Sequence, residues 1–394
     1  MTDIAERLEE LRESGLRRRL RLVQSPQGPR VLLDGEDVLL LCSNDYLGLA
    51  GHPRIRTAAA EAAMRWGACS GSARLISGNM PPHADLERRL AAFKGYESAL
   101  LFGSGYLANT GTIAALAGRG EVVFSDELNH ASIIDGCRLS RAETFVYRHR
   151  DVEHLAWGLR EAGERAALIV SDGLFSMDGD VAPLTELAEL GQRHDCRLLV
   201  DEAHATGTLG PGGRGSVAAA GLSGEVDIVV GTLGKALGSY GAYVCADAEL
   251  TEYLVNAARS FVFSTAPPPP AVAAAEAALE LLEAHPEKVE RVAANAATLR
   301  SALAAEGLPV AASGTQIVPL EIGDASLTMS LCERLLEGGV FAQGIRPPTV
   351  PAGTSRLRFS VTAAHRRVEL DDAAELVGTT ARDLGIASPT PLAA

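Results

Sequence analysis

The feature that most constrains the fold is an alternation of short apolar runs with helical stretches between residues 97 and 245. Stretches with helical spacing, such as 151–162 and 183–194, separate many of the apolar runs. Strands that alternate with helices are typical of a mostly parallel sheet with helices on both faces. The pattern therefore predicts one large α/β domain around seven strands. These candidate strands lie at 98–102, 121–124, 143–147, 167–170, 197–200, 226–230 and 241–245.

The N-terminal segment predicts a helix followed by a hairpin. Apolar side chains recur with helical spacing at the start of residues 4–20, which predicts an amphipathic helix. Asp34-Gly35 lies between two apolar runs at 30–42, and this dipeptide is typical of a tight hairpin turn. We therefore set residues 1–45 apart as an N-terminal helix with short strands.

The C-terminal part of the chain predicts a smaller α+β domain. A run of four prolines at 267–270 ends the alternating pattern, and the alanine-rich segment 271–305 predicts one long connecting helix. Further strands are expected near 316–322 and 356–361, and further helices near 327–337 and 366–382. We therefore expect residues 46–270 to form the large domain, and residues 271–394 the connecting helix and the small domain.

Charge and cysteine content narrow the possible partners. The formal net charge of −14 makes non-specific binding to nucleic acid or to an anionic membrane unfavourable. The chain contains no run of 18 apolar residues and no apolar signal-peptide core. Its six cysteines form no C-x-x-C pair, so neither a metal site nor a disulfide framework is expected. We expect a cytoplasmic protein with reduced thiols, without nucleic-acid or membrane partners.

Lysine is rare, and one lysine stands out. The chain has only Lys94, Lys235 and Lys288. Lys94 precedes Gly95 where a helix is expected to end, and a capping role is enough to explain it. Lys288 lies in a polar helical stretch and is interpreted as a surface residue. Lys235 follows an apolar strand within GTLGKALG, where small neighbours leave its amine accessible, although a purely structural role remains open.

Polar residues follow the preceding strand as well. Asp201 and His204 lie in VDEAH directly after an apolar run, and ligands of open α/β sheets bind beyond the carboxyl ends of the strands. A lysine that forms a Schiff base, with an aspartate facing a protonated pyridine nitrogen, is the arrangement that pyridoxal phosphate uses. The alternative for Asp201 is a cap on the next helix. The DEAH string is not read as a helicase motif, because no G-x-x-x-x-G-K-[ST] loop accompanies it.

A glycine-rich loop leaves a second function open. The string GSGYLA at 103–108 matches G-x-G-x-x-A between a strand and a helix, and Asp126 ends the next strand, where a ribose-binding acid is expected. On these residues alone a nicotinamide-dependent dehydrogenase is a credible alternative. The loop itself indicates only phosphate binding by backbone N–H groups at a helix N-terminus, which pyridoxal phosphate also requires. The dehydrogenase hypothesis leaves Lys235 and Asp201 unexplained.

Eight motifs in one order carry a family resemblance that runs from about residue 15 to about residue 370. They are SNDYLGL (43–49), GSGYLAN (103–109), NHAS (129–132), FSMDGD (175–180), VDEAH (200–204), GTLGKALG (231–238), FSTAPPP (263–269) and IRPPTVPAGTSRLR (345–358). Together they resemble the α-oxoamine synthases, which are pyridoxal-phosphate-dependent transferases of fold type I. The resemblance implies that fold, the cofactor, and a homodimer with its active sites at the interface.

The resemblance also implies roles for individual residues around the cofactor. Lys235 would hold it as a Schiff base and later move the α-proton, Asp201 would pair with the ring nitrogen, and His130 would stack on the ring. These three form the expected catalytic set, and His130 is expected to contact substrate too. The other expected cofactor residues are Gly105, Tyr106, Ser176, His204, Thr232 and, reaching the partner subunit's phosphate, Thr265.

The substrate side is implied in the same way. Arg358 is expected to bind the amino-acid carboxylate, because a guanidinium suits bidentate contact, but Arg356 is two residues away and hard to separate from it. Arg17 and Thr349 are expected to contact the acyl substrate or CoA, and Asn44 is expected near the substrate.

The IRPPTVPAGT loop narrows the expected reaction within the family. The resemblance of this loop to that of one branch of the family implies a decarboxylative condensation of L-alanine with pimeloyl-CoA, or with pimeloyl on a carrier protein. The alternatives within the family use glycine, with acetyl-CoA to give 2-amino-3-ketobutyrate or with succinyl-CoA to give 5-aminolevulinate. Serine palmitoyltransferase is a further relative.

Overall fold

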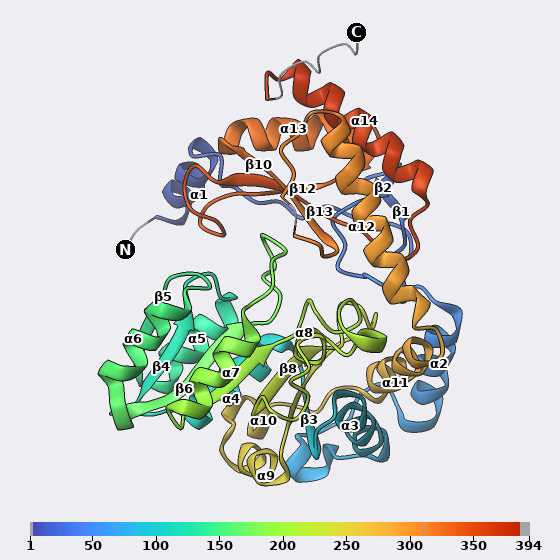
Figure 1. Cartoon of the computed structure of the whole chain (residues 1–394). Helices are drawn as coiled ribbons and strands as arrows, with labels where there is room; N and C mark the ends of the chain where they lie inside the picture. The colour runs from blue at the N-terminus through green and yellow to red at the C-terminus, as the bar shows by residue number, and fades with distance from the viewer. Residues whose placement is uncertain (1–2, 312, 387–394) are drawn as a thin grey trace. The chain divides into compact units, whose positions relative to one another are not determined.

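A computed structural model describes residues 3–311 and 313–386 of the chain, so the end of the predicted segment 271–394 lies outside the described residues. The chain divides into two compact units, which are described separately (Figure 1). Unit 1 contains Met1–Gly48, Met177–Gly179 and Glu290–Ala394. Unit 2 contains Leu49–Ser176 and Asp180–Val289.

Unit 2 is built on a seven-stranded sheet whose strand order is β3-β9-β8-β7-β6-β4-β5. All neighbouring strands pair in parallel except β9, which is antiparallel to both β3 and β8. The sheet confirms the predicted α/β fold with its mostly parallel strands. The strands are β3 Ser98–Phe102, β4 Val122–Asp126, β5 Glu143–Tyr147, β6 Ala166–Asp172, β7 Arg197–Asp201, β8 Ile228–Thr232 and β9 Ala242–Ala246.

The edge strand β3 joins the sheet from far along the chain. Its only partner among the described residues is β9, and Phe102 pairs with Ala242, 140 residues further on. The apolar side chains of β3 and β9 belong to the main hydrophobic core of unit 2, together with side chains of β4, β6, β7 and β8. Burial of these side chains holds the strand ends in fixed positions, which matters for the site described below.

Helices cover the sheet of unit 2, and α4 and α5 pack closely against each other. A Cβ atom added at Gly136 of α5 would lie 3.2 Å from the carbonyl oxygen of Asn109 in α4, so glycine permits this approach. The helices are α2 Pro53–Trp66, α3 Pro81–Lys94, α4 Gly105–Leu116, α5 Ala131–Ser140, α6 Val152–Ala162, α7 Leu184–Arg193, α8 Ser216–Ala219, α9 Ala248–Ala257, α10 Arg259–Val262 and α11 Pro269–Ala284.

Unit 1 contains two small sheets with helices. One sheet has the order β1-β2-β11 and the other β10-β13-β12, and α13 contacts all three strands of the second sheet. The strands are β1 Arg30–Leu33, β2 Glu36–Leu40, β10 Ile317–Gly323, β11 Val340–Phe341, β12 Gln343–Ile345 and β13 Ser355–Ser360. The helices are α1 Ile4–Glu13, α12 Glu287–Ala305, α13 Ala325–Glu337 and α14 Arg367–Asp383.

Two predicted helices differ from the structure, and both differences have local causes. The segment 271–305 forms two helices, because α11 ends at Ala284 and Pro286 has no N–H with which to continue the helical hydrogen bonds. The helix predicted over residues 4–20 ends at Glu13, and Gly15 takes a φ of +67° directly afterwards. The predicted hairpin at 30–42 is confirmed, with positive φ at both turn residues.

Among residues 3–311 and 313–386, no helix is both long and apolar enough to cross a lipid bilayer.

Candidate active site

The carboxyl ends of β7 and β8 bring the predicted lysine, aspartate and histidine to one edge of the unit 2 sheet. Asp201 is the last residue of β7, and Lys235 lies three residues beyond the end of β8. The Nζ atom of Lys235 is 2.7 Å from Nε2 of His204, which lies in the turn after β7. Residues separated by 31 positions therefore meet through the pairing of two neighbouring strands.

The Asp201 carboxylate is buried but well provided with donors. Its Oδ1 accepts the backbone N–H of Ala203 at 2.8 Å, and its Oδ2 accepts Nδ2 of Asn109 at 2.6 Å. Only 4% of Asp201 is exposed. Hydrogen bonds donated to a carboxylate favour its charged form, which offsets the cost of burial. The site thus presents a fixed negative charge beside a lysine and a histidine.

His130 follows β4 and caps the N-terminus of α5. Its backbone N–H donates to Oδ2 of Asp172 at 2.8 Å, and its ring Nδ1 accepts the backbone N–H of Ser132 at 3.3 Å. Packing around the ring lowers the pKa of His130, and Lys235 lowers it further, while Asp201 opposes both effects. The lowered pKa favours the neutral form of the His130 ring.

A second buried carboxylate, Asp172, lies beside Asp201 at the end of the neighbouring strand β6. Burial raises the pKa of Asp172 well above its usual range, and the negative charge of Asp201 raises it further. Two adjacent buried carboxylates cannot both ionise cheaply, so one of them retains a proton. The raised pKa of Asp172 favours its protonated form.

The N-terminus of α4 is the place where the sequence predicts an anion site. Ser104 caps this helix, and the following Gly105 and Tyr106 occupy its first turn, where backbone N–H groups have no partner inside the helix. A Cβ atom added at Gly105 would meet no atom within 4 Å, so there is open space at this end of the helix. The Tyr106 hydroxyl donates to Oδ2 of Asp135, so it points to a partner within the protein.

These features together fit pyridoxal phosphate. A lysine amine suits the aldehyde, a buried charged carboxylate suits a protonated ring nitrogen, and a helix N-terminus suits the phosphate. Among the described residues, no group of three or more histidine, cysteine, aspartate or glutamate side chains could hold a metal ion.

Three further predicted cofactor residues lie in unit 2 but are less constrained. Thr232 ends β8, where its hydroxyl donates to the carbonyl oxygen of Gly241 at 3.1 Å. Ser176 is half-buried in the loop after β6. Thr265 is exposed and pairs with Ala73 in an isolated antiparallel bridge. Their roles at the cofactor stay predictions.

Unit 1 holds the predicted substrate residues, and Arg358 is the best positioned of them. Arg358 lies in the central strand β13 and is 6% exposed. Its guanidinium donates to the hydroxyl oxygens of Ser360 at 3.0 Å and Tyr46 at 3.3 Å, and approaches Oδ1 of Asn44 at 3.4 Å. Arg358 and Asn44, 314 positions apart, therefore belong to one polar cluster, which also fixes the Tyr46 hydroxyl.

Arg356 differs from Arg358 in its partner. It forms an ion pair with Asp178, a residue of the loop after β6 that groups with unit 1, and its Nε donates to the carbonyl oxygen of Thr354 at 3.0 Å. Because a carboxylate of the protein already engages Arg356, Arg358 is the better candidate for binding the carboxylate of a ligand.

Arg17 and Thr349 line one cavity of about 940 Å³ within unit 1. Both residues are exposed, and Nη2 of Arg346 donates to the carbonyl oxygen of Arg17 at 3.0 Å. Arg18, Arg19 and Arg21 line the same cavity, while Met329, Leu336 and Phe341 give it an apolar wall. A pocket that is basic on one side and apolar on another suits an acyl chain that carries negative charges.

The structure corrects the interpretation of Lys94. Lys94 ends α3 as predicted, but its side chain does more than a capping role requires: it is 3% exposed and forms an ion pair with Glu202, which is completely buried. Glu202 also accepts the Ser216 hydroxyl at 2.9 Å and the backbone N–H of Val217 at 2.7 Å. Burial lowers the pKa of Lys94, but the Glu202 carboxylate more than offsets this and the pKa ends above its usual value. This pair anchors the turn that carries Asp201 and His204.

The carboxylate of Asp126, the candidate ribose-binding acid, already accepts hydrogen bonds from other residues of the protein. Its Oδ1 accepts Nδ1 of His149 at 2.9 Å, and its Oδ2 accepts the backbone N–H of Arg150 at 2.9 Å. His149 also contacts Asp180 through Nε2 at 2.8 Å. Burial lowers the pKa of His149, but its bonds to the two aspartates raise it to about 9. The residue that favoured a dehydrogenase therefore serves a charged structural cluster.

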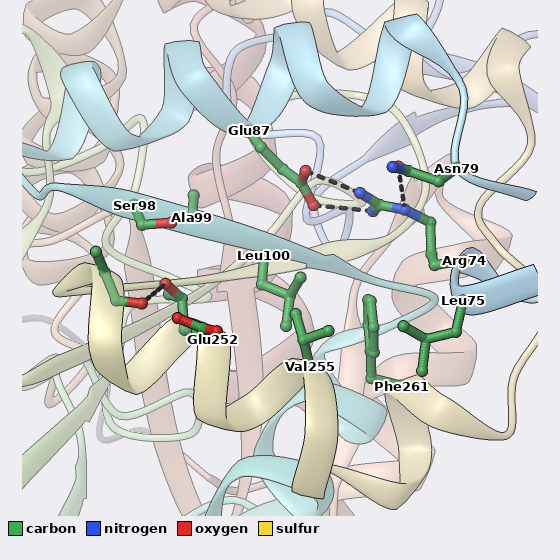
Figure 2. Close-up of a pocket in the computed structure, with 12 residues that line it drawn as sticks. Arg74, Leu75, Asn79, Glu87, Ser98, Ala99, Leu100, Glu252, Val255 and Phe261 are labelled. Carbon is green, nitrogen blue, oxygen red and sulfur yellow. Dashed lines mark hydrogen bonds and ion pairs between the residues drawn. The ribbon is translucent and has the colours of Figure 1, made fainter.

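A cavity of about 390 Å³ lies in unit 2, and none of the predicted site residues lines it. Figure 2 shows its lining, in which the Arg74 guanidinium makes two bonds to the Glu87 carboxylate, at 2.8 and 2.9 Å. Nε of Arg74 donates to Oδ1 of Asn79 at 2.9 Å. Arg74 follows Ala73, which pairs with Thr265, so this ion pair fixes the segment that holds Thr265 in place.

Comparison with known proteins gives a consistent family match. The family model described as aminotransferase class I and II matches residues 36–377. An 8-amino-7-oxononanoate synthase from Geobacter sulfurreducens is 53% identical over 386 residues, covering 97% of this chain and 99% of the relative. A protein of the same name from Citrifermentans bemidjiense is 51% identical over 389 residues, covering 98% of this chain and 100% of the relative.

A solved structure is also similar over nearly the whole chain. Serine palmitoyltransferase from S. paucimobilis, solved with a bound PLP-myriocin aldimine, superposes with a TM-score of 0.92 at 34% identity. The match covers 97% of this chain and 98% of that protein.

Proposed function

Because the chain belongs to the class I and II aminotransferase family, we propose that it is a pyridoxal-phosphate enzyme that condenses L-alanine with pimeloyl-CoA. The products are 8-amino-7-oxononanoate, CoA and carbon dioxide, a step of biotin synthesis. The substrate assignment rests on the names of relatives that are 51% and 53% identical over nearly their full lengths. The cofactor assignment is supported by the residues around Lys235 as well as by the family.

The observation that carries the proposal is the contact of Lys235 with His204 beside the buried Asp201. When bound, the cofactor supplies an electron sink for charge that develops on the amino-acid α-carbon. Lys235 holds the cofactor, and its amine then removes the α-proton of the amino acid and returns a proton to the product. His204 positions the Lys235 amine and is available to the ring oxygen of the cofactor.

Asp201 keeps a negative charge opposite the ring nitrogen, which favours protonation of that nitrogen. His130 provides a flat neutral ring for stacking. Gly105 and Tyr106 offer backbone N–H groups to the phosphate, with Thr232 and Ser176 as further contacts.

On the substrate side, Arg358 binds the amino-acid carboxylate, and Asn44 helps to orient the guanidinium. Arg17 and Thr349 contact the acyl donor, whose negative groups are attracted by the basic side of the unit 1 cavity. Pimeloyl carried on an acidic carrier protein would be attracted by the same arginines.

We further propose a cytoplasmic homodimer in which Thr265 reaches the phosphate bound by the partner subunit. Thr265 is exposed, and large apolar side chains near it in sequence or pairing are exposed too, namely Leu75 at 50%, Ile76 at 79% and Phe263 at 71%. Burial of this apolar surface favours association. Analytical ultracentrifugation is expected to give a dimer, and Ile76→Asp is expected to yield monomer. A wild-type monomer would contradict the proposal.

The substrate assignment is tested by release of free thiol from a matrix of amino acids and acyl-CoAs. Cofactor-loaded protein receives alanine, glycine or serine with pimeloyl-, acetyl-, succinyl- or palmitoyl-CoA. We expect release with alanine and pimeloyl-CoA only. The serine and palmitoyl-CoA pair tests the function of the structurally similar serine palmitoyltransferase, and preference for that pair or for glycine would overturn the substrate assignment but not the cofactor assignment.

A further inference from the structure

Asn109 is a completely buried amide in the middle of α4. Its Nδ2 donates to Oδ2 of Asp201 at 2.6 Å and to the hydroxyl oxygen of Ser132 at 2.9 Å. Its Oδ1 is buried and has no hydrogen-bond partner among residues 3–311 and 313–386. A buried amide oxygen without a partner is costly, so both donors of the amide must contribute enough to retain it.

The direction of each hydrogen bond in this chain is fixed by its neighbours. An ionised Asp201 can only accept, so Asn109 must turn its NH₂ group, and not its oxygen, towards the carboxylate. The second hydrogen of that NH₂ group then points at the Ser132 oxygen, which becomes an acceptor. The hydroxyl hydrogen of Ser132 remains for Nδ1 of His130, which lies 2.7 Å away.

A second contact also places a hydrogen-bond donor at Nδ1 of His130. The backbone N–H of Ser132 also lies 3.3 Å from Nδ1 of His130, and a backbone N–H can only donate. Two donors therefore face Nδ1, so this nitrogen carries no proton and the ring proton resides on Nε2. The His130 backbone is held separately, because its N–H donates to Asp172 at 2.8 Å.

We propose that Asn109 and Ser132 are positioning residues that couple the charge of Asp201 to the tautomer of His130. The ionised carboxylate orients the amide, the amide orients the hydroxyl, and the hydroxyl keeps Nδ1 of His130 unprotonated. The titratable groups that face His130 are Asp201 and Lys235 at its ring and Asp172 at its backbone N–H.

The consequence for catalysis rests on the proposed pyridoxal-phosphate function, whereas the hydrogen-bond relay does not. A histidine in the Nε2–H form is neutral, so it can stack on a protonated pyridine ring without like-charge repulsion. Through the relay, the same carboxylate that favours the protonated pyridine thus selects the Nε2–H tautomer of the stacking ring, while burial of the ring favours its neutral form.

The tautomer is read by two-bond ¹H–¹⁵N correlation spectra of ¹⁵N-histidine-labelled protein, full-length, with and without cofactor. His130→Gln identifies the His130 signals. We expect wild-type protein to show the Nε2–H form alone at neutral pH. We expect Ser132→Ala to increase the Nδ1–H form at least about tenfold, because one hydrogen bond is worth roughly a factor of ten in population. The control Thr110→Val removes a buried hydroxyl bond from the same helix, to the carbonyl oxygen of Tyr106, and should leave the tautomer unchanged.

Asn109→Leu tests the other end of the relay. It removes one donor from Asp201 and should shift the His130 tautomer, and it should also weaken cofactor binding about 10- to 100-fold. Cofactor affinity is measured by fluorescence titration. If Ser132 had a purely structural role, Ser132→Ala and Thr110→Val would lose the same stability. Both variants would then also keep the Nε2–H signal of His130.

An unchanged His130 tautomer in Ser132→Ala would overturn the relay, even if Asn109→Leu does not fold. The spectra require no substrate, so they test the relay independently of the proposed function. If the wild-type protein releases no thiol, but its His130 shows the Nε2–H signal and Ser132→Ala changes that signal, the proposed function is refuted and the relay stands.

Discussion

Lys235, Asp201 and His204 lie at the ends of neighbouring buried strands in unit 2, whereas Arg17 and Thr349 lie on exposed segments of unit 1. In unit 2, Asp201 and Lys235 each contact a second side chain, that of Asn109 and that of His204. In unit 1, Arg358 and Asn44 are held in this way by one polar cluster, whereas Arg17 and Thr349 are exposed. The difference suggests that cofactor chemistry depends on the rigid sheet, and that contact with the acyl donor depends on surface residues that tolerate change.

The largest effect is expected from Lys235→Ala in unit 2. Without the amine the cofactor can bind only non-covalently, and the proton transfers lose their base, so kcat should fall on the order of 10⁴-fold or more. Borohydride reduction followed by mass spectrometry should label wild-type protein and not the variant. Lys288→Ala, in α12, is the matched control and should retain activity. Near-native turnover by Lys235→Ala would end the proposed mechanism.

The next largest effect, on stability, is expected at the buried ion pair of Lys94 and Glu202 in unit 2. Lys94→Met leaves a buried carboxylate without its counter-charge and should lower the free energy of unfolding by about 3–5 kcal/mol. Urea denaturation measures this. The double variant Lys94→Met/Glu202→Gln removes the stranded charge and should be more stable than the single one. If the two variants unfold at the same urea concentration, the pair does not carry charge in the folded protein.

The two units should respond to pH in opposite directions. In unit 2, the folded-state pKa of His149 is raised from 6.5 to about 9, so its stabilising effect is complete below pH 6.5 and is lost as the pH rises through 9. In unit 1, burial lowers the pKa of His365 from 6.5 to about 4, so its stabilising effect is present above pH 6.5 and is lost as the pH falls through 4. Each shift corresponds to at most about 3 kcal/mol.

Thermal unfolding followed from pH 4 to 10 measures both effects. His149→Gln should remove the alkaline decline in stability between pH 6.5 and 9, and His365→Gln should remove part of the acid decline between pH 6.5 and 4. An alkaline decline that persists unchanged in His149→Gln would show that another group causes it.

Within unit 1, substitutions of the two arginines of β13 should differ in their effects on the kinetics of each substrate. Arg358→Ala should raise the KM for L-alanine about 10- to 100-fold, because a charge-assisted bond to the carboxylate is lost, and should change the KM for pimeloyl-CoA little. Arg356→Ala breaks the ion pair with Asp178 and should mainly lower stability. Steady-state kinetics with each substrate varied in turn distinguish them. A larger increase in the KM for alanine in Arg356→Ala would reverse the assignment.

The smallest effect is expected at Arg17, on an exposed segment of unit 1. Arg17→Gln should raise the KM for the acyl donor only about two- to fivefold, and the increase should shrink at high salt, since exposed charges interact weakly. Arg119→Gln removes an equal charge from an exposed position in unit 2 and serves as the control. A hundredfold effect of Arg17→Gln would show that this segment is as tightly organised as the strand ends.

The sequence predicted the sheet well, because each strand of unit 2 is a short apolar run between polar turns. It predicted Lys235 and Asp201 for the same reason, since both follow such runs. The prediction from sequence failed at Lys94, because the residues next to it in the chain already offered a sufficient role for it. Lys94 fits a helix C-terminus in the sequence, and its partner Glu202 lies 108 residues away, so only the fold shows the ion pair.

Asn109 was missed for a related reason. It ends the GSGYLAN motif, but within a helix a single polar residue shows no periodic pattern that distinguishes a buried amide from an exposed one. The available signal was its position in an otherwise small and apolar stretch, LANTGTIAALA. Its partners Ser132 and Asp201 come from two other parts of the chain, and only the packing of α4 beside the strand ends brings them together.

The late pairing of β3 has a consequence for how the chain acquires its binding site during synthesis. Phe102 leads directly towards the start of α4, yet its strand partner Ala242 emerges from the ribosome 140 residues later, which is roughly 10–30 s at ordinary translation rates. Strands β4 to β7 can pair during that interval, but β3 has no sheet to join until β9 is present. A nascent chain is therefore expected to complete the centre of its sheet first and to acquire affinity for a phosphate only when β9 locks β3 in place.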